Sequence, residues 1–209
     1  KVPIENMLSE RENGFKIAMN ALNTGRIKLA VACIDAERRI INTAINYSNE
    51  RVQFNKKINE FGAVSQKLAM MATDLYAGES ATYRAAKNIE DRIRILESEG
   101  KNHQEAELKG VEEYVIECSM LKVALSDDAQ NIADEAIQIY GGMGYSTEMP
   151  VESAWRDSRI ARIYEGTNEI NRLVSIGMLI KKALKGHIDL ITQAEKVAEE
   201  LTGIPSFEV

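Results

Sequence analysis

The sequence predicts an all-α fold: an up-down bundle of four long antiparallel helices with a short extra helical tail. The chain of 209 residues has only three prolines and thirteen glycines, and 44% of its residues are hydrophobic, which is typical of helix-rich globular proteins. Apolar residues recur at helical spacing over three long segments. Short polar connections join these segments, which favours antiparallel neighbours in a bundle.

The first long helix is expected after a short lead-in. Pro3 and a cluster of charged residues predict that residues 1–13 are extended rather than helical. Gly14 ends this lead-in. From Phe15 to about Ser48 there is no proline, and the apolar residues keep a helical period, so the segment predicts a helix of roughly 50 Å.

Two further long helices follow the first. The second begins near Phe61 and should end close to Gly100, with its apolar residues on one face. The third keeps the helical period without interruption from Leu108 to Ile139 and stops at the glycine pair 141–142.

A fourth helix over residues 168–184 should cover the remaining apolar seam of the bundle. Thr167 or Asn168 can cap this helix. Its apolar stripe is expected to face the core and comprises Ile170, Leu173, Val174, Gly177, Ile180 and Leu184.

The segments around the fourth helix are also expected to have structure of their own. Residues 143–165 combine a glycine turn, Pro150 and a short helical piece at about 151–157, and connections of this kind are often functional. After Gly186, residues 188–201 predict a last amphipathic helix.

Composition and charge exclude several classes of function. The formal net charge of -6 argues against nucleic acid as a partner, because such proteins carry clustered basic patches. No apolar run is long enough to span a membrane. Cys33 and Cys118 lack metal-ligand spacing and lie within helical patterns, so they are interpreted as core thiols of a protein in a reducing compartment. No metal site is expected.

Glu165 is the strongest candidate for a catalytic residue. It lies between Tyr164 and Gly166, directly ahead of the fourth helix, where a proton-abstracting base at a helix entrance would be placed. The rival interpretation is an ordinary surface position, because the chain has 32 acidic residues and most such residues are solvated. Local patterns alone leave both interpretations open.

Two other patterns also allow both a functional and a purely structural interpretation when taken alone. The glycine-rich run 141–144 follows a helix and lacks dinucleotide spacing, so a helix stop explains it better. Arg51, Gln53 and Phe54 could form the polar end of the first helix–helix connection.

Taken together, ordered motifs carry a resemblance to a known family. The motifs are Val2 to Phe15, Leu22 to Arg26, Arg51 to Phe54, Phe61 with Lys67 to Ala69, Gln138 to Tyr145, Arg156-Asp157 and Tyr164 to Ile170. In this order they resemble the C-terminal domain of the acyl-CoA dehydrogenases over nearly the whole chain.

The resemblance implies FAD-dependent α,β-dehydrogenation of an acyl-CoA thioester in fatty-acid β-oxidation. Glu165 matches the family's base, which removes a proton from Cα while the flavin accepts a hydride from Cβ. No rival base exists, because Gly25 stands where some branches place one. The family also implies a homodimer or homotetramer formed through the bundle, and electron-transfer flavoprotein as the acceptor. The compartment would be the cytoplasm in a bacterium or the mitochondrial matrix in a eukaryote.

Other roles carry over by position. The resemblance implies substrate-side roles, near the CoA thioester and the catalytic loop, for Asn23, Arg26, Tyr164 and Gly166. It implies FAD contacts on the same side of the site for Thr167, Asn168 and Glu169. It implies contacts with FAD, including that of a neighbouring subunit, for Arg51, Gln53, Phe54, Phe61, Gln138, Gly141 and Gly142. Asn55 stands where the family usually has glycine, and it can adopt a positive φ at modest cost.

The resemblance also divides the chain. Residues 1–13 would lead in from an absent β-domain, residues 14–186 would form the helical bundle, and residues 187–209 would begin a helical extension similar to that of the very-long-chain branch. Because the family's other two domains have no counterpart here, this fragment by itself is expected to be inactive and to retain little FAD.

Three alternative functions fit parts of the sequence or of the predicted fold. An acyl-CoA oxidase shares the base and the flavin but passes electrons to oxygen. A non-catalytic helical oligomerisation fragment needs no flavin. A di-iron bundle needs Glu-x-x-His pairs, which the chain lacks, because Gly100 precedes His103 by three residues and Leu184 precedes His187.

Overall fold

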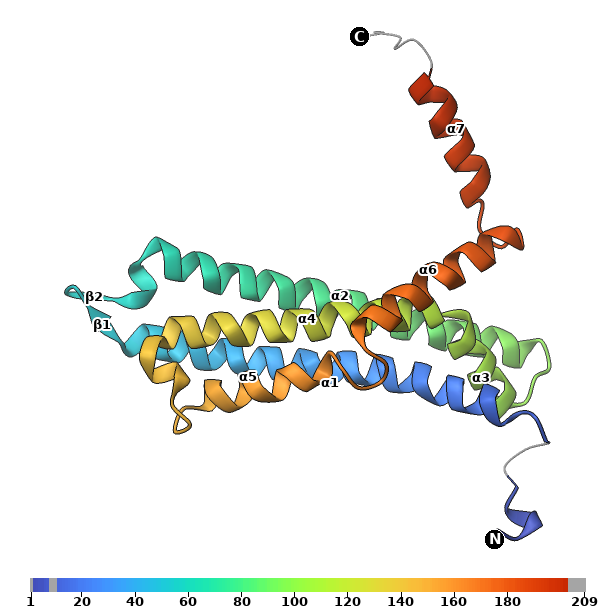
Figure 1. Ribbon diagram of the computed structural model, residues 1–209, viewed down its shortest axis with the longest axis horizontal. Coiled ribbons are helices and arrows are strands. Elements are labelled where there is room, and N and C mark those ends of the chain that lie inside the picture. Colours follow the sequence, from blue (N-terminus) through green and yellow to red (C-terminus); the bar gives the residue numbers. More distant parts are fainter. Residues whose placement is uncertain (1, 8–10, 203–209) are drawn as a thin grey trace.

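A computed structural model of the chain describes residues 2–7 and 11–202, which are almost wholly helical and confirm the all-α prediction (Figure 1). The helices are α1 (Gly14–Glu50), α2 (Gly62–Ser98), α3 (His103–Glu113), α4 (Val115–Tyr140), α5 (Pro150–Ala161), α6 (Asn168–Leu184) and α7 (Leu190–Thr202). Two-residue strands, β1 (Val52–Gln53) and β2 (Lys56–Lys57), form the link between α1 and α2. Short 3-10 turns occupy Ile4–Asn6, Ile58–Glu60 and Gly141–Tyr145.

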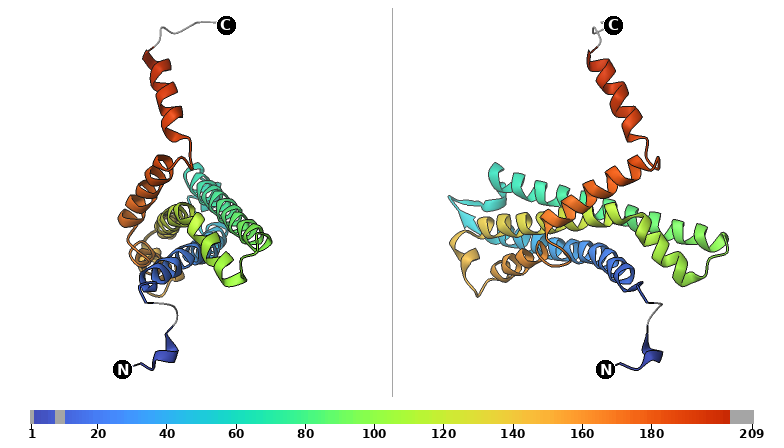
Figure 2. Two further views of the ribbon diagram at one scale, coloured as in Figure 1. Left: turned by 90° about the vertical axis from the view of Figure 1, so that its right-hand side faces the viewer. Right: turned by 45° about the vertical axis from the view of Figure 1, so that its right-hand side comes forward.

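Three long helices run up and down beside one another. α1 packs along α4, and α2 packs against both. α5 covers part of α1 and α4, while α6 crosses α4 obliquely and leads into α7, which projects away from the bundle (Figures 1 and 2). The described part of the helical tail therefore agrees with the prediction, and residues 203–209 lie outside the described residues.

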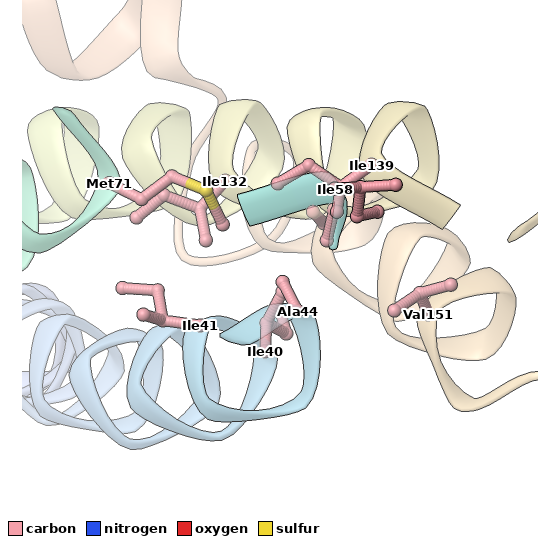
Figure 3. Close-up of a cluster of buried hydrophobic side chains, with 10 residues drawn as sticks. Ile40, Ile41, Ala44, Ile58, Met71, Ile132, Ile139 and Val151 are labelled. Atoms are coloured by element: carbon pink, nitrogen blue, oxygen red, sulfur yellow. The ribbon is translucent and has the colours of Figure 1, made fainter. Parts of the chain in front are cut away.

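The core lies where α1, α2 and α4 meet. In Figure 3, apolar side chains of these helices, together with Ile58 and Val151, point toward one another. The buried members from the three helices are Ile40, Ile41, Ala44, Met71, Ile132, Ala133, Ala136 and Ile139. A second cluster farther along α1 contains Leu29, Ile34 and Leu125. The helical periodicity of the sequence therefore identified the core faces of α1 and α4.

The third predicted helix is divided in two. Tyr114 has φ -102° and ψ 26°, and its amide donates to the carbonyl of Val111 at 3.1 Å. This tighter turn ends α3 and begins α4 with a change of direction. The prediction of one uninterrupted helix was therefore wrong. The sequence does not reveal the break, because the apolar spacing continues through it.

The predicted orientation of α6 was also wrong. Leu173 and Leu184 of its apolar stripe are 74% and 72% exposed, and Ile170 and Ile180 are about half exposed. The face that packs on α4 instead contains Asn168, Asn171, Ser175 and Ala183. Polar side chains turn inward here because they have partners: Asn171 donates to carbonyl groups of the preceding turn, and Asn168 binds side chains of α4. An apolar stripe predicts a covered surface without specifying which partner covers it.

The link between α1 and α2 is a tight hairpin. Val52 pairs with Lys57 and Gln53 pairs with Lys56. The two turn residues, Phe54 and Asn55, have φ of 50° and 62°, as a type I′ turn requires at both central positions. Asn55 therefore takes the positive φ expected of it, and the hairpin extends beyond the end of the bundle (Figure 1).

Candidate active site

Glu165 lies in the turn between α5 and α6, and this turn has an unusual backbone. Glu165 and Gly166 have φ of 60° and 83°. A positive φ is uncommon for a residue with a side chain, and it persists only where the surrounding contacts impose it. Thr167 then caps α6, because its hydroxyl oxygen accepts a hydrogen bond from the amide of Ile170 at 3.3 Å.

The carboxylate of Glu165 lies directly against α1 at Gly25. A Cβ added to Gly25 would stand 2.7 Å from one carboxylate oxygen and 2.8 Å from the other. Contacts between such atoms do not occur at this distance, so the carboxylate occupies the space that any other residue at position 25 would fill. The two positions, 140 residues apart in the sequence, therefore share one place in the fold.

Arg26 is buried beside this turn and binds its backbone. Its Nε donates to the carbonyl of Glu165 at 3.3 Å, and its Nη1 donates to Asn23 Oδ1 at 3.0 Å and to Ser119 Oγ at 3.2 Å. Burial lowers the pKa of Arg26, while the neighbouring Cys118 and Glu165 raise it. A guanidinium is basic enough to keep its charge in such surroundings.

Two buried side chains that were not singled out in the sequence also bind the turn. Lys122 Nζ donates to the carbonyl of Gly166 at 2.8 Å and to Asn168 Oδ1 at 2.7 Å. Asn171 Nδ2 lies 3.4, 2.8 and 3.1 Å from the carbonyl oxygens of residues 165, 166 and 167. One signal pointed to Lys122: it lies four residues after Cys118, on the apolar face of the third predicted helix.

The amide groups of the turn point to a ligand site. Within the described residues, the amides of Glu165, Gly166 and Thr167 donate to no protein acceptor. The carbonyl oxygens of the same residues are all bound from the interior. The turn thus presents three hydrogen-bond donors beside a carboxylate, an arrangement that can stabilise charge on a substrate oxygen.

An open groove begins beside the turn. It has a volume of about 350 Å³ and a mostly apolar lining from α1, α4, α5 and Tyr164. On α1 its lining includes Leu29, Cys33 and Ala36, which continue the helix face on which Gly25 lies because they recur at helical spacing. Burial raises the pKa of Cys33 to about 12, so its thiol remains protonated and serves as an apolar wall.

The remaining predicted site residues lie at the far end of the bundle. Arg51, Gln53 and Phe54 belong to the exposed hairpin, where the Phe54 ring meets that of Phe61 edge-on at 6.4 Å. Gln138, Gly141 and Gly142 lie at the end of α4. This end is close to the hairpin, because Tyr140 of α4 stacks at 3.9 Å on Tyr47, which lies near the end of α1.

The predicted site residues therefore form two separate groups. Along α1, Arg51 is about 37 Å from Arg26 at 1.5 Å per residue. Asn23, Arg26, Tyr164 and residues 165–169 come together in one group, and the hairpin and the end of α4 form the other.

Two further features bear on function. Among residues 2–7 and 11–202, no group of three histidine, cysteine or acidic side chains could hold a metal ion. No helix in this part of the chain combines the length and apolarity needed to cross a bilayer. The two cysteines are buried and free, as predicted.

Comparison with known proteins identifies the family. The family described as acyl-CoA dehydrogenase, C-terminal domain, matches residues 12–178. A probable acyl-CoA dehydrogenase of Bacillus subtilis is 45% identical over 201 residues, which cover 96% of this chain and 34% of that protein. The very long-chain specific acyl-CoA dehydrogenase of rat mitochondria is 36% identical over 220 residues, covering 99% of this chain and 31% of that protein.

A solved structure agrees with these matches. The crystal structure of an acyl-CoA dehydrogenase complexed with FAD from Bacillus anthracis superposes with a TM-score of 0.91 at 42% identity, covering 98% of this chain and 35% of that one. The chain thus spans about a third of the length of the relatives it matches. The chain belongs to the acyl-CoA dehydrogenase family, as a C-terminal helical domain.

Proposed function

We propose that this chain is the part of an FAD-dependent acyl-CoA dehydrogenase that supplies the catalytic base, Glu165. The observation that carries the proposal is the turn itself. The carboxylate is held over Gly25 beside three amide groups that have no acceptor within the described residues. A base and hydrogen-bond donors in one place are what removal of a proton next to a carbonyl group requires.

Each part of the turn has a separate role in this chemistry. The α-proton of a thioester is a very weak acid, so the site must exclude water and stabilise the negative charge that moves onto the thioester oxygen. In this proposal the Glu165 carboxylate takes the proton, and the amide of the same residue donates to that oxygen. Gly166 allows the close approach of the ligand to the backbone.

The residues present fit FAD as the cofactor. The free amide of Thr167 at the N-terminal end of α6 offers a donor to an anionic or carbonyl oxygen. Arg51 on the exposed hairpin can bind phosphate, and a Cβ added at Gly141 or Gly142 would meet nothing within 4 Å, which leaves the end of α4 open to a ligand. When bound, FAD supplies the acceptor for the hydride that leaves Cβ.

The substrate is proposed to be an acyl-CoA whose chain is apolar. The groove that begins at Tyr164 and follows α1 supports this, because its lining is mostly aliphatic. The tail over α7 resembles the very-long-chain branch. The length of the acyl chain that the enzyme accepts is set by the complete pocket.

A homodimer or homotetramer is part of the proposal. Arg51 lies about 37 Å from Arg26 along α1, and this separation supports a role for the hairpin and Gln138 at the FAD of a neighbouring subunit rather than their own. The exposed apolar stripe on α6 supports contact with a second copy.

We propose that electron-transfer flavoprotein is the electron acceptor. The alternative acceptor is oxygen, which would make the protein an acyl-CoA oxidase. The compartment would be the cytoplasm of a bacterium or the mitochondrial matrix of a eukaryote. The isolated chain, which provides only part of the site, is expected to be inactive on its own.

The test is Glu165→Gln in the full-length flavoprotein. The variant should retain FAD but lose acyl-CoA-dependent bleaching of the flavin absorbance by a factor of about 1,000 or more, because the amide cannot accept a proton. Exposed Glu112→Gln is the matched control and should bleach normally. Normal bleaching in Glu165→Gln would show that another group is the base, and hydrogen peroxide produced in place of reduced electron-transfer flavoprotein would favour the oxidase.

A further inference from the structure

We propose that Lys122 and Asn171 are positioning residues for Glu165. By binding the carbonyl oxygens of residues 165–167, they fix the turn that holds the carboxylate over Gly25. The inference rests on the proposed function and adds to it, because neither side chain reaches the carboxylate.

Lys122 is unusual because a fully buried lysine is rare. Its side chain is completely buried, and it forms no ion pair with a carboxylate among the described residues. Instead, its ammonium group donates to the carbonyl of Gly166 and to the Asn168 side chain. A charge buried at this cost is retained only where its hydrogen bonds are well made, so the turn and the ammonium group stabilise each other.

Asn171 completes the set of donors from the first turn of α6. Its side chain is fully buried, and its Nδ2 is shared among the three carbonyl oxygens of the turn. Donors from α1, α4 and α6 therefore meet at consecutive carbonyl groups of the turn, and they belong to Arg26, Lys122 and Asn171. This convergence explains why all three carbonyl groups face inward.

The inward-facing carbonyl groups determine how the rest of the turn is oriented. Within a planar trans peptide unit the N–H group points opposite to the C=O group, so fixing the carbonyl groups of residues 165 and 166 turns the amides of Gly166 and Thr167 away from the donors. The same contacts hold Glu165 at its positive φ of 60°. Without them, the backbone would relax toward ordinary negative φ. The carboxylate would then leave its place over Gly25.

A second layer orients the partners of Lys122. Asn168 Nδ2 donates to Asp127 Oδ1 at 3.0 Å, which turns its Oδ1 toward the ammonium group. Asp127 also pairs with Arg162 and Arg172, each at 2.7 Å. These two arginines flank the turn, so its ends and its centre are tied to the same part of α4.

The experiment compares Lys122→Met and Asn171→Leu with the wild type in the full-length flavoprotein. Four quantities are measured: bound flavin, thermal midpoint, the dissociation constant of an unreactive thioether analogue of an acyl-CoA, and the anaerobic rate of flavin bleaching by an acyl-CoA per bound flavin. Misplacing a catalytic group by about 1 Å can cost about 100-fold. We expect the bleaching rate to fall about 10- to 100-fold in each variant, while analogue binding changes less than about threefold.

Two controls separate positioning from stability. Ile132→Ala removes a buried core side chain of α4 that touches no part of the turn, so it should lower the thermal midpoint and leave the rate per bound flavin unchanged. Lys122→Arg keeps a cationic donor and should recover part of the rate that Lys122→Met loses.

Each outcome is decisive. A wild type that shows no bleaching with any acyl-CoA overturns the proposed function, whereas an active wild type with normal rates in the variants overturns the positioning roles. If Lys122→Met does not fold, Asn171→Leu decides, because it is nearly isosteric. A loss of stability or flavin in Asn171→Leu with an unchanged rate per bound flavin would make the residue structural and would also overturn the inference.

Discussion

At the scale of single residues, the site depends on a glutamate and on the glycine that makes room for its side chain. Glu165 carries a carboxylate on a strained backbone, and Gly25 leaves room for it on α1. The sequence predicted both residues as important, since Gly25 excluded a rival base. Their contact could not be predicted, because the two residues are far apart in the chain and meet only after α1 and α6 have packed on α4.

Gly25→Ala tests this pair directly. The new methyl group would meet the end of the Glu165 side chain, which can move, rather than backbone. Folding should therefore be preserved or slightly strengthened, since alanine favours a helix by about 1 kcal/mol, while acyl-CoA-dependent flavin bleaching should slow about tenfold or more. Gly14→Ala, where the added Cβ meets nothing within 4 Å, is the control. An unchanged rate in Gly25→Ala would show that the carboxylate does not act from this place.

At the scale of elements, periodicity predicted helices better than it predicted their neighbours. The bounds of α1 agree with the sequence within two residues, because a long unbroken apolar period leaves little choice. The break at Tyr114 was missed because a single tight turn leaves that period intact. Lys122 was missed for a related reason: helical spacing places it on the core face, but only the packed turn supplies its partners.

The packing of α1 against α2 and α4 includes a buried acidic layer with a titration of its own. Glu37 is fully buried, and neither of its carboxylate oxygens has a hydrogen-bond partner among the described residues. Burial, followed by the charges of Asp128 and Asp74, raises its pKa to about 8. Burial and neighbouring charges also raise the pKa of Asp128, to about 6. The helices are therefore packed around a Glu37 carboxyl group that remains largely protonated at neutral pH.

Stability should consequently fall as pH rises through this range. The ordinary pKa of Glu37 is 4.5 and its folded pKa is about 8, so between these values the folded state binds more protons than the unfolded state. Its contribution is complete below about pH 4.5 and is lost as the pH approaches 8. Glu37→Gln should raise the free energy of unfolding by a few kcal/mol at about pH 8.5 and change it little at about pH 5, as measured by urea denaturation.

Exposed Glu112 provides the control for this titration. Glu112→Gln should leave the pH dependence unchanged, because its carboxyl group is about half exposed. Parallel stability curves for the wild type and Glu37→Gln would contradict the assignment of the titration to this layer.

At the scale of the whole molecule, the chain leaves two apolar features exposed at its surface. The hairpin extends past the bundle with Phe54 87% exposed, and α6 shows its apolar stripe to the outside. Neither feature contributes to the core of the single chain. Both support the proposal that the bundle forms subunit contacts at its surface and shares a cofactor site across them.

The stripe on α6 gives the last prediction. Leu173 lies within it and is 74% exposed, so Leu173→Glu should fold normally yet place a charge in an apolar contact between subunits. A charge buried without a partner at an interface costs several kcal/mol, which is enough to shift a dimer or tetramer toward smaller species in sedimentation velocity. Tyr76→Glu on α2, at the same 74% exposure, is the matched control and should sediment like the wild type. Identical sedimentation of wild type and Leu173→Glu would mean that something other than a second copy covers the stripe.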